Sequence, residues 1–181
     1  MSLSSIYQRT ASYIRRNGLK ETVYAGADRL SEMCADIRYN GSVRKVDSRE
    51  LERQKKQTFE RSVKFSILVP AFDPDPVFFR QMMESVLAQS YENFELIIAD
   101  GGMKDDLRRM SVHFADTRIK YRRLDPGGGI SANTNAALAE ASGDYVTLMD
   151  HDDFIEPDAL YETVRAVQNG ADIVYTDEDK Y

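Results

Sequence analysis

Cysteine and histidine are scarce in this sequence of 181 residues, which contains one of the former and two of the latter. A single cysteine, Cys34, excludes an intramolecular disulfide and a zinc site built on thiolates, so a reducing compartment is favoured. The histidines are His113 and His151, and neither cysteine nor any serine stands in a nucleophile-elbow context. The sequence therefore does not support a catalytic triad.

Long apolar runs are also absent. No stretch approaches the roughly 18 uncharged residues that a membrane-spanning helix requires, and the first residues lack the apolar segment of a signal peptide. We therefore expect a cytoplasmic protein, with peripheral attachment to the inner face of the membrane as the alternative.

The pattern G-x-x-x-x-G-K-[ST] does not occur, which excludes a P-loop nucleotide hydrolase.

Charge is divided unevenly along the chain. Residues 1–64 contain 14 Lys/Arg and 8 Asp/Glu, a net charge of +6, whereas residues 65–181 contain 10 and 22, a net charge of −12. Such asymmetry is typical of two parts with different partners. It predicts a basic N-terminal segment over residues 1–62 and a separate acidic domain over residues 63–181.

The basic segment has helical periodicity. Residues 3–14 and 22–39 are each predicted to form a helix, and the charge-rich residues 44–64 to form an exposed linker helix. Docking of this segment to acidic lipid or to a protein partner is the alternative. Nucleic-acid binding is not expected, because acidic residues interrupt the basic ones and no aromatic residues are interleaved with them.

From Phe65 onward, short apolar runs alternate with amphipathic stretches. The predicted strands cover residues 65–69, 94–99, 118–124, 145–149 and 172–175, and the predicted helices cover 76–88, 104–114, 130–141 and a segment that begins at Pro157. This order predicts an α/β fold whose sheet is mostly parallel, with helices on both faces. Ligands bind beyond the carboxyl ends of such strands, which directs attention to residues 71–75, 100–104, 125–129 and 150–156.

The last of these loops contains the acidic run Asp150-His151-Asp152-Asp153. In an extended chain, Asp150 and Asp152 point to the same side. Two converging carboxylates repel each other unless a divalent cation such as Mg²⁺ or Mn²⁺ neutralises them. Capping of the next helix is the structural alternative, but the place at the end of a buried strand favours the metal.

A glycine-rich run follows the third predicted strand. Residues 127–132, GGGISA, satisfy a loose G-x-G-x-x-A, and Asp150 lies at the right distance for a ribose contact, which together would indicate a dinucleotide-binding oxidoreductase. The fingerprint belongs after a first strand, however, and Pro126 stands where a tight turn is required. The glycines could also form a flexible turn or let the backbone approach a sugar or diphosphate.

Several segments together resemble a known family. The runs FSILVPAFDPDPVFFRQMMESVLAQSYENFELIIADGG, GGGISANTNAALAEASGDYVTLMDHDD and DIVYTDEDKY resemble the family 2 inverting glycosyltransferases of the GT-A fold, a Rossmann-like architecture. The likeness covers residues 63–181. The preceding run ERQKKQTFERSVKF is similar to the leader of bacterial members that act on polysaccharides or cell-surface glycans.

The resemblance implies a nucleotide-sugar donor, usually a UDP-sugar, a divalent metal, Mn²⁺ or Mg²⁺, and a glycan or lipid-linked acceptor. The residues that match the donor-binding positions are Pro70, Ala71, Asp73, Asp100, Gly129, Ser131, Asn135 and Asp150. Asp150 and Asp152 match the D-x-D pair that binds the metal and the diphosphate.

Two departures from the family pattern concern the donor pocket. The usual D-D-G-S is replaced by Asp100-Gly101-Gly102-Met103, so the second carboxylate, often the one that reads the base, is missing. The Asn that usually ends the first motif is Asp73.

Inverting transfer also needs a general base, which the family supplies after the fifth strand. We expect it beyond Tyr181, with Asp177 and Glu178 as weaker candidates, so that the chain is the donor-binding part without the acceptor-binding half. A catalytically silent nucleotide-binding or scaffold module is the second hypothesis, and the NAD-binding oxidoreductase is the third.

Overall fold

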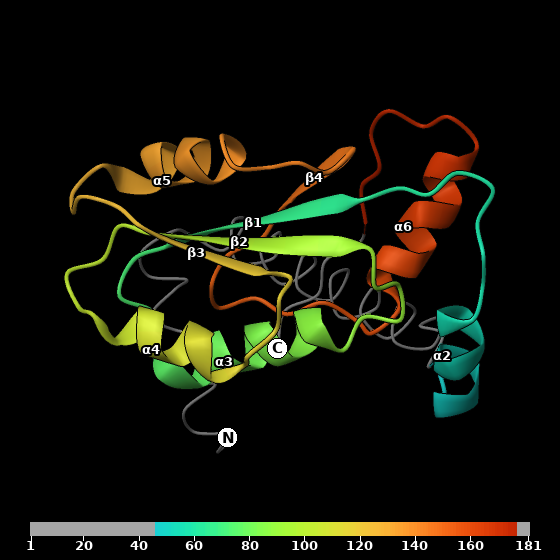
Figure 1. Cartoon of the computed structure of the whole chain (residues 1–181), viewed down its shortest axis with the longest axis horizontal. Coiled ribbons are helices and arrows are strands. Elements are labelled where there is room, and N and C mark those ends of the chain that lie inside the picture. The colour runs from blue at the N-terminus through green and yellow to red at the C-terminus, as the bar shows by residue number, and fades with distance from the viewer. Residues whose placement is uncertain (1–45, 177–181) are drawn as a thin grey trace, which may run out of the picture. The chain divides into compact units, whose positions relative to one another are not determined.

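The computed structural model describes residues 46–176, which fold within one compact unit (Figure 1). The predicted helices within residues 1–39 lie outside this range. The helices are α2 (Ser48–Lys55), α3 (Pro76–Leu87), α4 (Asp106–His113), α5 (Gly129–Leu138) and α6 (Ala159–Gln168). The strands are β1 (Phe65–Ala71), β2 (Phe94–Asp100), β3 (Ile119–Arg123) and β4 (Tyr145–Leu148).

The four strands form one parallel sheet in the order β3-β2-β1-β4. Strand β1 lies inside the sheet, paired with β2 over seven residues and with β4 over four. Helix α5 lies on one face, and α3 and α4 lie on the other (Figure 1). The predicted α/β fold, with a parallel sheet covered on both faces, is confirmed.

Alternation along the central strands builds a core on each face. Phe65, Ile67 and Val69 of β1 point into the larger core, which side chains of α3, α4 and α6 complete. Leu68 points the other way, into a smaller core that includes Ala137 of α5. Because β1 and β2 are buried on both faces, their sequences are almost continuously apolar rather than alternating.

Two local predictions were wrong. Residues 172–175 do not form a strand in the described part of the chain, and Ile173 and Tyr175 are 85% and 91% exposed. An apolar run needs a neighbouring strand to pair with, and none of the described strands pairs with this one. Helix α6 begins at Ala159 rather than at Pro157, whose carbonyl instead accepts a hydrogen bond from the Ser90 N–H at 2.8 Å.

The charge-rich segment contains the short helix α2. The Asp47 carboxylate caps it by accepting the Glu50 N–H at 2.8 Å, and Glu50 pairs with Arg53 one turn later. Its surface is largely exposed except for Gln54, whose amide oxygen accepts a hydrogen bond from the Ser90 hydroxyl at 2.6 Å. This contact attaches α2 to the α/β fold, while the predicted boundary near residue 63 stays a prediction.

None of the helices in residues 46–176 is long and apolar enough to cross a membrane.

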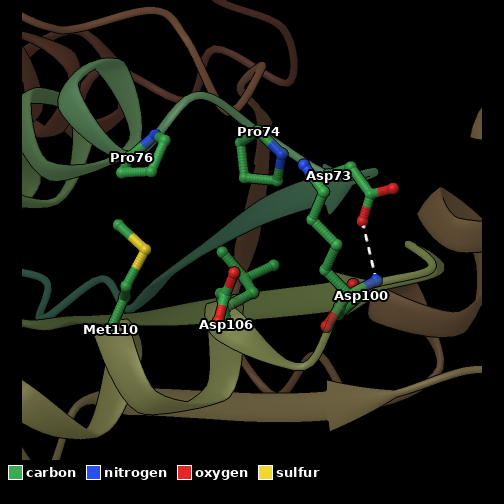
Figure 2. Close-up of a pocket in the computed structure, with 8 residues that line it drawn as sticks. Asp73, Pro74, Pro76, Asp100, Asp106 and Met110 are labelled. Carbon is green, nitrogen blue, oxygen red and sulfur yellow. Dashed lines mark hydrogen bonds between the residues drawn. The ribbon is translucent and has the colours of Figure 1, made fainter.

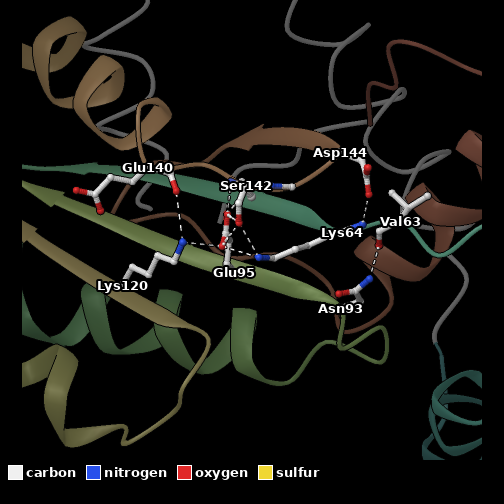
Figure 3. Close-up of polar contacts among 10 residues, drawn as sticks. Val63, Lys64, Asn93, Glu95, Lys120, Glu140, Ser142 and Asp144 are labelled. Carbon is white, nitrogen blue, oxygen red and sulfur yellow. Dashed lines mark hydrogen bonds and ion pairs between the residues drawn. The ribbon is translucent and has the colours of Figure 1, made fainter.

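A buried carboxylate lies near the amino ends of the strands, beside the segment that joins α5 to β4 (Figure 3). Glu95 of β2 is 3% exposed and receives hydrogen bonds from Lys64, Ser66, Lys120 and the backbone of Ser142 at 2.6–2.9 Å. Burial raises the pKa of Glu95, but these hydrogen bonds outweigh burial and leave it well below its usual range. Glu95 is therefore ionised in the folded protein at neutral pH.

Candidate active site at the carboxyl ends of the strands

All four loops singled out in the sequence leave the same edge of the sheet, because the strands are parallel. Strands β2 and β3 are added to the sheet on one side of β1, and β4 is added on the other side. The direction in which successive strands are added therefore reverses at β1. Open α/β sheets bind ligands at such a reversal, outside the carboxyl ends of the strands. The candidate site therefore lies around the end of β1, at Ala71.

Asp73 ties the loop after β1 to the loop after β2. One of its carboxylate oxygens accepts the N–H groups of Met103 and Lys104, each at 2.9 Å. Its backbone has a φ of +44°, in the left-handed region that Asp tolerates better than most residues. A Cβ at Gly102 would lie 2.6 Å from this carboxylate and 2.8 Å from the Asp73 nitrogen. The two loops can approach this closely only because residue 102 is glycine.

We expect Gly102→Ala to lower the free energy of unfolding by about 1–3 kcal/mol, since the added methyl group overpacks a backbone contact. Urea denaturation measures the loss. Met103→Ala is the matched control, because that side chain is 69% exposed and its removal should change stability by less than about 0.5 kcal/mol. Equal stability of the two variants would contradict the role given to Gly102.

Asp100, at the end of β2, is 1% exposed and fully engaged. It accepts hydrogen bonds from the Tyr121 hydroxyl at 2.6 Å, from Arg123 Nη1 at 2.7 Å and from the Gly102 N–H at 2.9 Å. Burial and the hydrogen bond to Asp100 raise the pKa of Tyr121 to about 12. Asp100 thus fixes the turn after β2, and direct contact with a nucleotide stays a prediction.

A pocket lies between the loop after β1 and helix α4 (Figure 2). Asp73, from the loop after β1, and Asp100, the last residue of β2, are both in its lining. The remaining lining residues are Pro74, Pro76, Lys104, Asp106, Leu107 and Met110. The pocket therefore brings two of the predicted site residues together.

The end of β1 also presents an aromatic ring that the sequence analysis missed. Phe72 follows the buried Ala71 and is 52% exposed, next to Asp73. The sequence signal that could have identified it is an aromatic residue between the end of a predicted strand and an acidic residue. Ala71 itself offers its carbonyl, which accepts the Gly101 N–H at 3.0 Å, and Pro70 is half-buried.

The glycine run forms the turn into α5. Gly127 and Gly129 have φ values of +96° and +76°, which favour glycine. No side chain of the described residues caps the helix, so its first N–H groups point out of the turn at the carboxyl edge. Ser131 and Asn135 are exposed on α5. An uncapped helix N-terminus after a glycine turn suits a phosphate group.

The acidic run after β4 forms a turn rather than the extended segment considered in the sequence analysis. The turn is closed by a hydrogen bond of 3.3 Å from the Asp153 N–H to the Asp150 carbonyl. Asp150 and Asp152 are exposed, and His151 Nδ1 lies 3.8 Å from an Asp152 oxygen. Within residues 46–176 no three His, Cys, Asp or Glu side chains are grouped to hold a metal ion. Exposed carboxylates still suit a cation that takes its other ligands from water and from substrate phosphates.

A family model now connects this geometry with known proteins. The model described as "Glycosyl transferase family 2" matches residues 66–181. This chain belongs to glycosyltransferase family 2. The candidate general bases, Asp177 and Glu178, are within the match but outside the described residues.

Two curated relatives are similar over most of the same domain. An uncharacterised protein of Sinorhizobium fredii, y4gI, is 41% identical over 120 residues, which are 64% of this chain and 13% of that protein. Glycosyltransferase GlyA of Streptococcus pneumoniae is 33% identical over 115 residues, which are 61% of this chain and 16% of that protein. The chain thus spans less than one fifth of the length of these two relatives.

Two solved structures share the fold. Staphylococcus aureus TarS in complex with UDP-GlcNAc aligns with a TM-score of 0.54 and 24% identity, over 59% of this chain and 31% of that one. A mannosyltransferase of Pyrobaculum calidifontis, in complex with GDP-Man and Mn²⁺, aligns with a TM-score of 0.51 and 18% identity, over 65% and 37%. Together with the parallel sheet, these likenesses confirm the predicted GT-A architecture.

Proposed function

We propose that this chain is the donor-binding part of an inverting glycosyltransferase, which transfers a sugar from a UDP-sugar to a glycan or lipid-linked acceptor. One observation carries the proposal: an uncapped helix N-terminus, two exposed carboxylates and an exposed aromatic ring emerge at the same edge of the sheet. They come from the loops after β3, β4 and β1. Membership of family 2 and the fold shared with TarS support this assignment.

Each group has a role that fits its chemistry. The Phe72 ring offers a face on which a nucleobase stacks. The first N–H groups of α5 point toward the diphosphate, and the glycine turn gives the phosphates close access to the backbone. Asp150 and Asp152 would hold Mn²⁺ or Mg²⁺, which when bound neutralises charge on the departing diphosphate. Asp177 and Glu178 remain the candidates in this chain for deprotonating the acceptor hydroxyl.

Electrostatics predicts that donor binding depends on the metal. Residues 65–181 carry a net charge of −12, and the exposed Asp150 and Asp152 lie at the edge that the diphosphate would approach. Like charges repel most strongly when no counter-ion lies between them. A divalent cation turns this repulsion into a bridge between the carboxylates and the phosphate oxygens.

Calorimetric titration of the chain with UDP, with and without Mn²⁺, tests the proposal. We expect binding that requires Mn²⁺. A chain that binds no nucleotide under either condition would be the silent scaffold module. Binding of NAD(H) irrespective of metal, without binding of UDP, would establish the oxidoreductase hypothesis instead.

Stacking on Phe72 gives a second test. We expect Phe72→Ala to weaken UDP binding by about tenfold, the order of effect that loss of one base-aromatic stack produces, whereas Phe72→Tyr should retain the affinity. The affinities are measured by the same titration with Mn²⁺ present. Phe78→Ala is the control, because this ring is equally exposed, at 51%, but lies in the first turn of α3. If both alanine variants weaken binding alike, the base does not stack specifically on Phe72.

A further inference from the structure

Asn133 is a buried polar residue that neither the family pattern nor the D-x-D motif singles out. It lies in the second turn of α5 and is 3% exposed. Its Nδ2 donates a hydrogen bond of 3.2 Å to the carbonyl of Ala71, at the carboxyl end of β1. The side chain thus connects α5 to the end of β1, the strand at which the strand order reverses.

The other half of this amide has no partner. Asn133 Oδ1 is buried and accepts no hydrogen bond from the described residues. Turning the amide over would not help, since Oδ1 would then face the Ala71 carbonyl, which is also an acceptor. Buried acceptors are almost always satisfied in folded proteins, so an orphaned one at a binding edge indicates a missing donor.

The absence of a side chain at Gly101 leaves room for the Asn133 amide. A Cβ at residue 101 would lie 2.6 Å from both Asn133 Nδ2 and Oδ1, so the amide occupies the space into which any side chain at this position would project. The adjacent carboxylate of Asp100 is already engaged by Tyr121 and Arg123. Between the ends of β1 and β2, Asn133 Oδ1 is thus a buried side-chain acceptor that the described residues leave for a ligand.

We propose that Asn133 is a specificity-determining residue whose Oδ1 accepts a hydrogen bond from the nucleoside of the donor, either from the base imide N–H or from a ribose hydroxyl. This inference rests on the proposed function and adds a residue to the same site. The glycine turn is the backbone next to this oxygen, since the Cβ position of Gly128 is 3.9 Å from Oδ1, and the nucleoside would approach from this side. The flanking glycines, Gly127 and Gly129, have open space around their Cβ positions, so the described residues do not fill the region beside the turn.

Analogues that each lack one donor identify the hydrogen bond. The unmodified chain is titrated, with Mn²⁺ present, with UDP, N3-methyl-UDP, 2′-deoxy-UDP and 3′-deoxy-UDP. We expect one analogue to bind about fivefold or more weakly than UDP, because it leaves Oδ1 unsatisfied. The methylated analogue reports on the base, and the deoxy analogues report on the ribose.

The same titrations with Asn133→Ala connect the lost hydrogen bond to this residue. The variant should bind UDP about as weakly as the unmodified chain binds the sensitive analogue, and it should no longer distinguish the two. Leu138→Ala, a half-exposed position later in α5, should retain the full discrimination. Thermal melting shows whether each variant is folded.

Two results would overturn the inference. One is equal affinity of the unmodified chain for UDP and for all three analogues, a test that does not depend on any variant folding. The other is discrimination that persists unchanged in a folded Asn133→Ala chain. Failure of the unmodified chain to bind UDP at all is a different result, because it overturns the proposed function together with this inference.

Discussion

The Asp152→Ala variant is expected to lose most of the Mn²⁺-dependent affinity for UDP. Substitution of residues that merely support a metal ligand weakens metal binding by about 10–100-fold, so removing a ligand itself should weaken it by about 100-fold or more. Calorimetric titration of UDP at fixed Mn²⁺ measures the effect. Any residual affinity without Mn²⁺ should not fall, because one negative charge has been removed from the edge that the diphosphate approaches.

Two further variants distinguish the loss of a metal ligand from the loss of one negative charge. Asp152→Asn keeps the size of the side chain but not its charge, and we expect it to behave nearly like the alanine variant. Asp172→Ala removes another exposed carboxylate, from the segment after α6, and it should retain Mn²⁺-dependent binding. If Asp172→Ala is as damaged as Asp152→Ala, the net charge of the domain, rather than a metal site at the acidic turn, governs nucleotide binding.

The second large effect concerns stability. We expect Glu95→Gln to lower the free energy of unfolding by about 2 kcal/mol or more at neutral pH, somewhat less than the 3–5 kcal/mol typical of breaking a fully buried pair. The expected loss of stability is smaller than for a fully buried pair because the side chains of Lys64 and Lys120 are 36% and 43% exposed and keep partial contact with water. Glutamine would turn an amide N–H₂ toward a cluster of donors, including the Ser142 N–H and the Lys64 ammonium group.

The pH dependence of this difference gives a sharper test. The pKa of Glu95 in the folded chain lies well below the value near 4.3 of an unfolded glutamate, so its ionised form stabilises the fold above that value. As the pH falls below about 4.3, the unfolded chain takes up the proton first and the stabilisation is progressively lost. The stability gap between the unmodified chain and Glu95→Gln should therefore be constant from pH 7 to about 5 and shrink at lower pH.

Denaturation in urea at several pH values measures this gap. Glu140→Gln is the control, because Glu140 pairs with Arg122 at the surface and contributes less than about 1 kcal/mol. A gap between the unmodified chain and Glu95→Gln that does not change between pH 5 and pH 3 would show that Glu95 does not stabilise the fold through its charge.

Most of the fold followed from local sequence patterns. The apolar runs at residues 65–69 and 94–99 predicted two strands of a parallel sheet covered on both faces, and the structure has them as β1 and β2. The start of α3 was predicted at Pro76, where the carboxylate of Asp75 caps the helix by accepting the Val77 N–H at 2.8 Å. These predictions succeeded because the signals that decide them lie within a few residues of each other.

The predicted strand at residues 172–175 failed for the opposite reason. Its apolar side chains fit a strand, but strand formation depends on pairing with another segment, and periodicity carries no information about partners. The start of α6 shows the same limit. Pro157 is a good first residue for a helix, yet its carbonyl hydrogen-bonds to Ser90, which lies 67 residues earlier in the chain.

The acidic residues of the candidate site show what the sequence by itself determined and what it left open. The sequence placed Asp73, Asp100, Asp150 and Asp152 at strand ends, and parallel strands bring such residues to one edge. It did not distinguish between them. Only the tertiary structure decided that Asp73 and Asp100 are engaged by backbone and side-chain donors, while Asp150 and Asp152 are exposed.

The physical reason is that the partners of a carboxylate are set by strand register and loop packing. The register places Asp100 opposite Arg123, and Tyr121 projects from the same face of β3, although both residues are more than 20 positions away in the chain. Asn133 and Gly101 meet through the packing of α5 on the sheet in the same way. Residue type and position along the chain determined which chemistry gathers at this edge, and the three-dimensional contacts decided which groups remain available to a ligand.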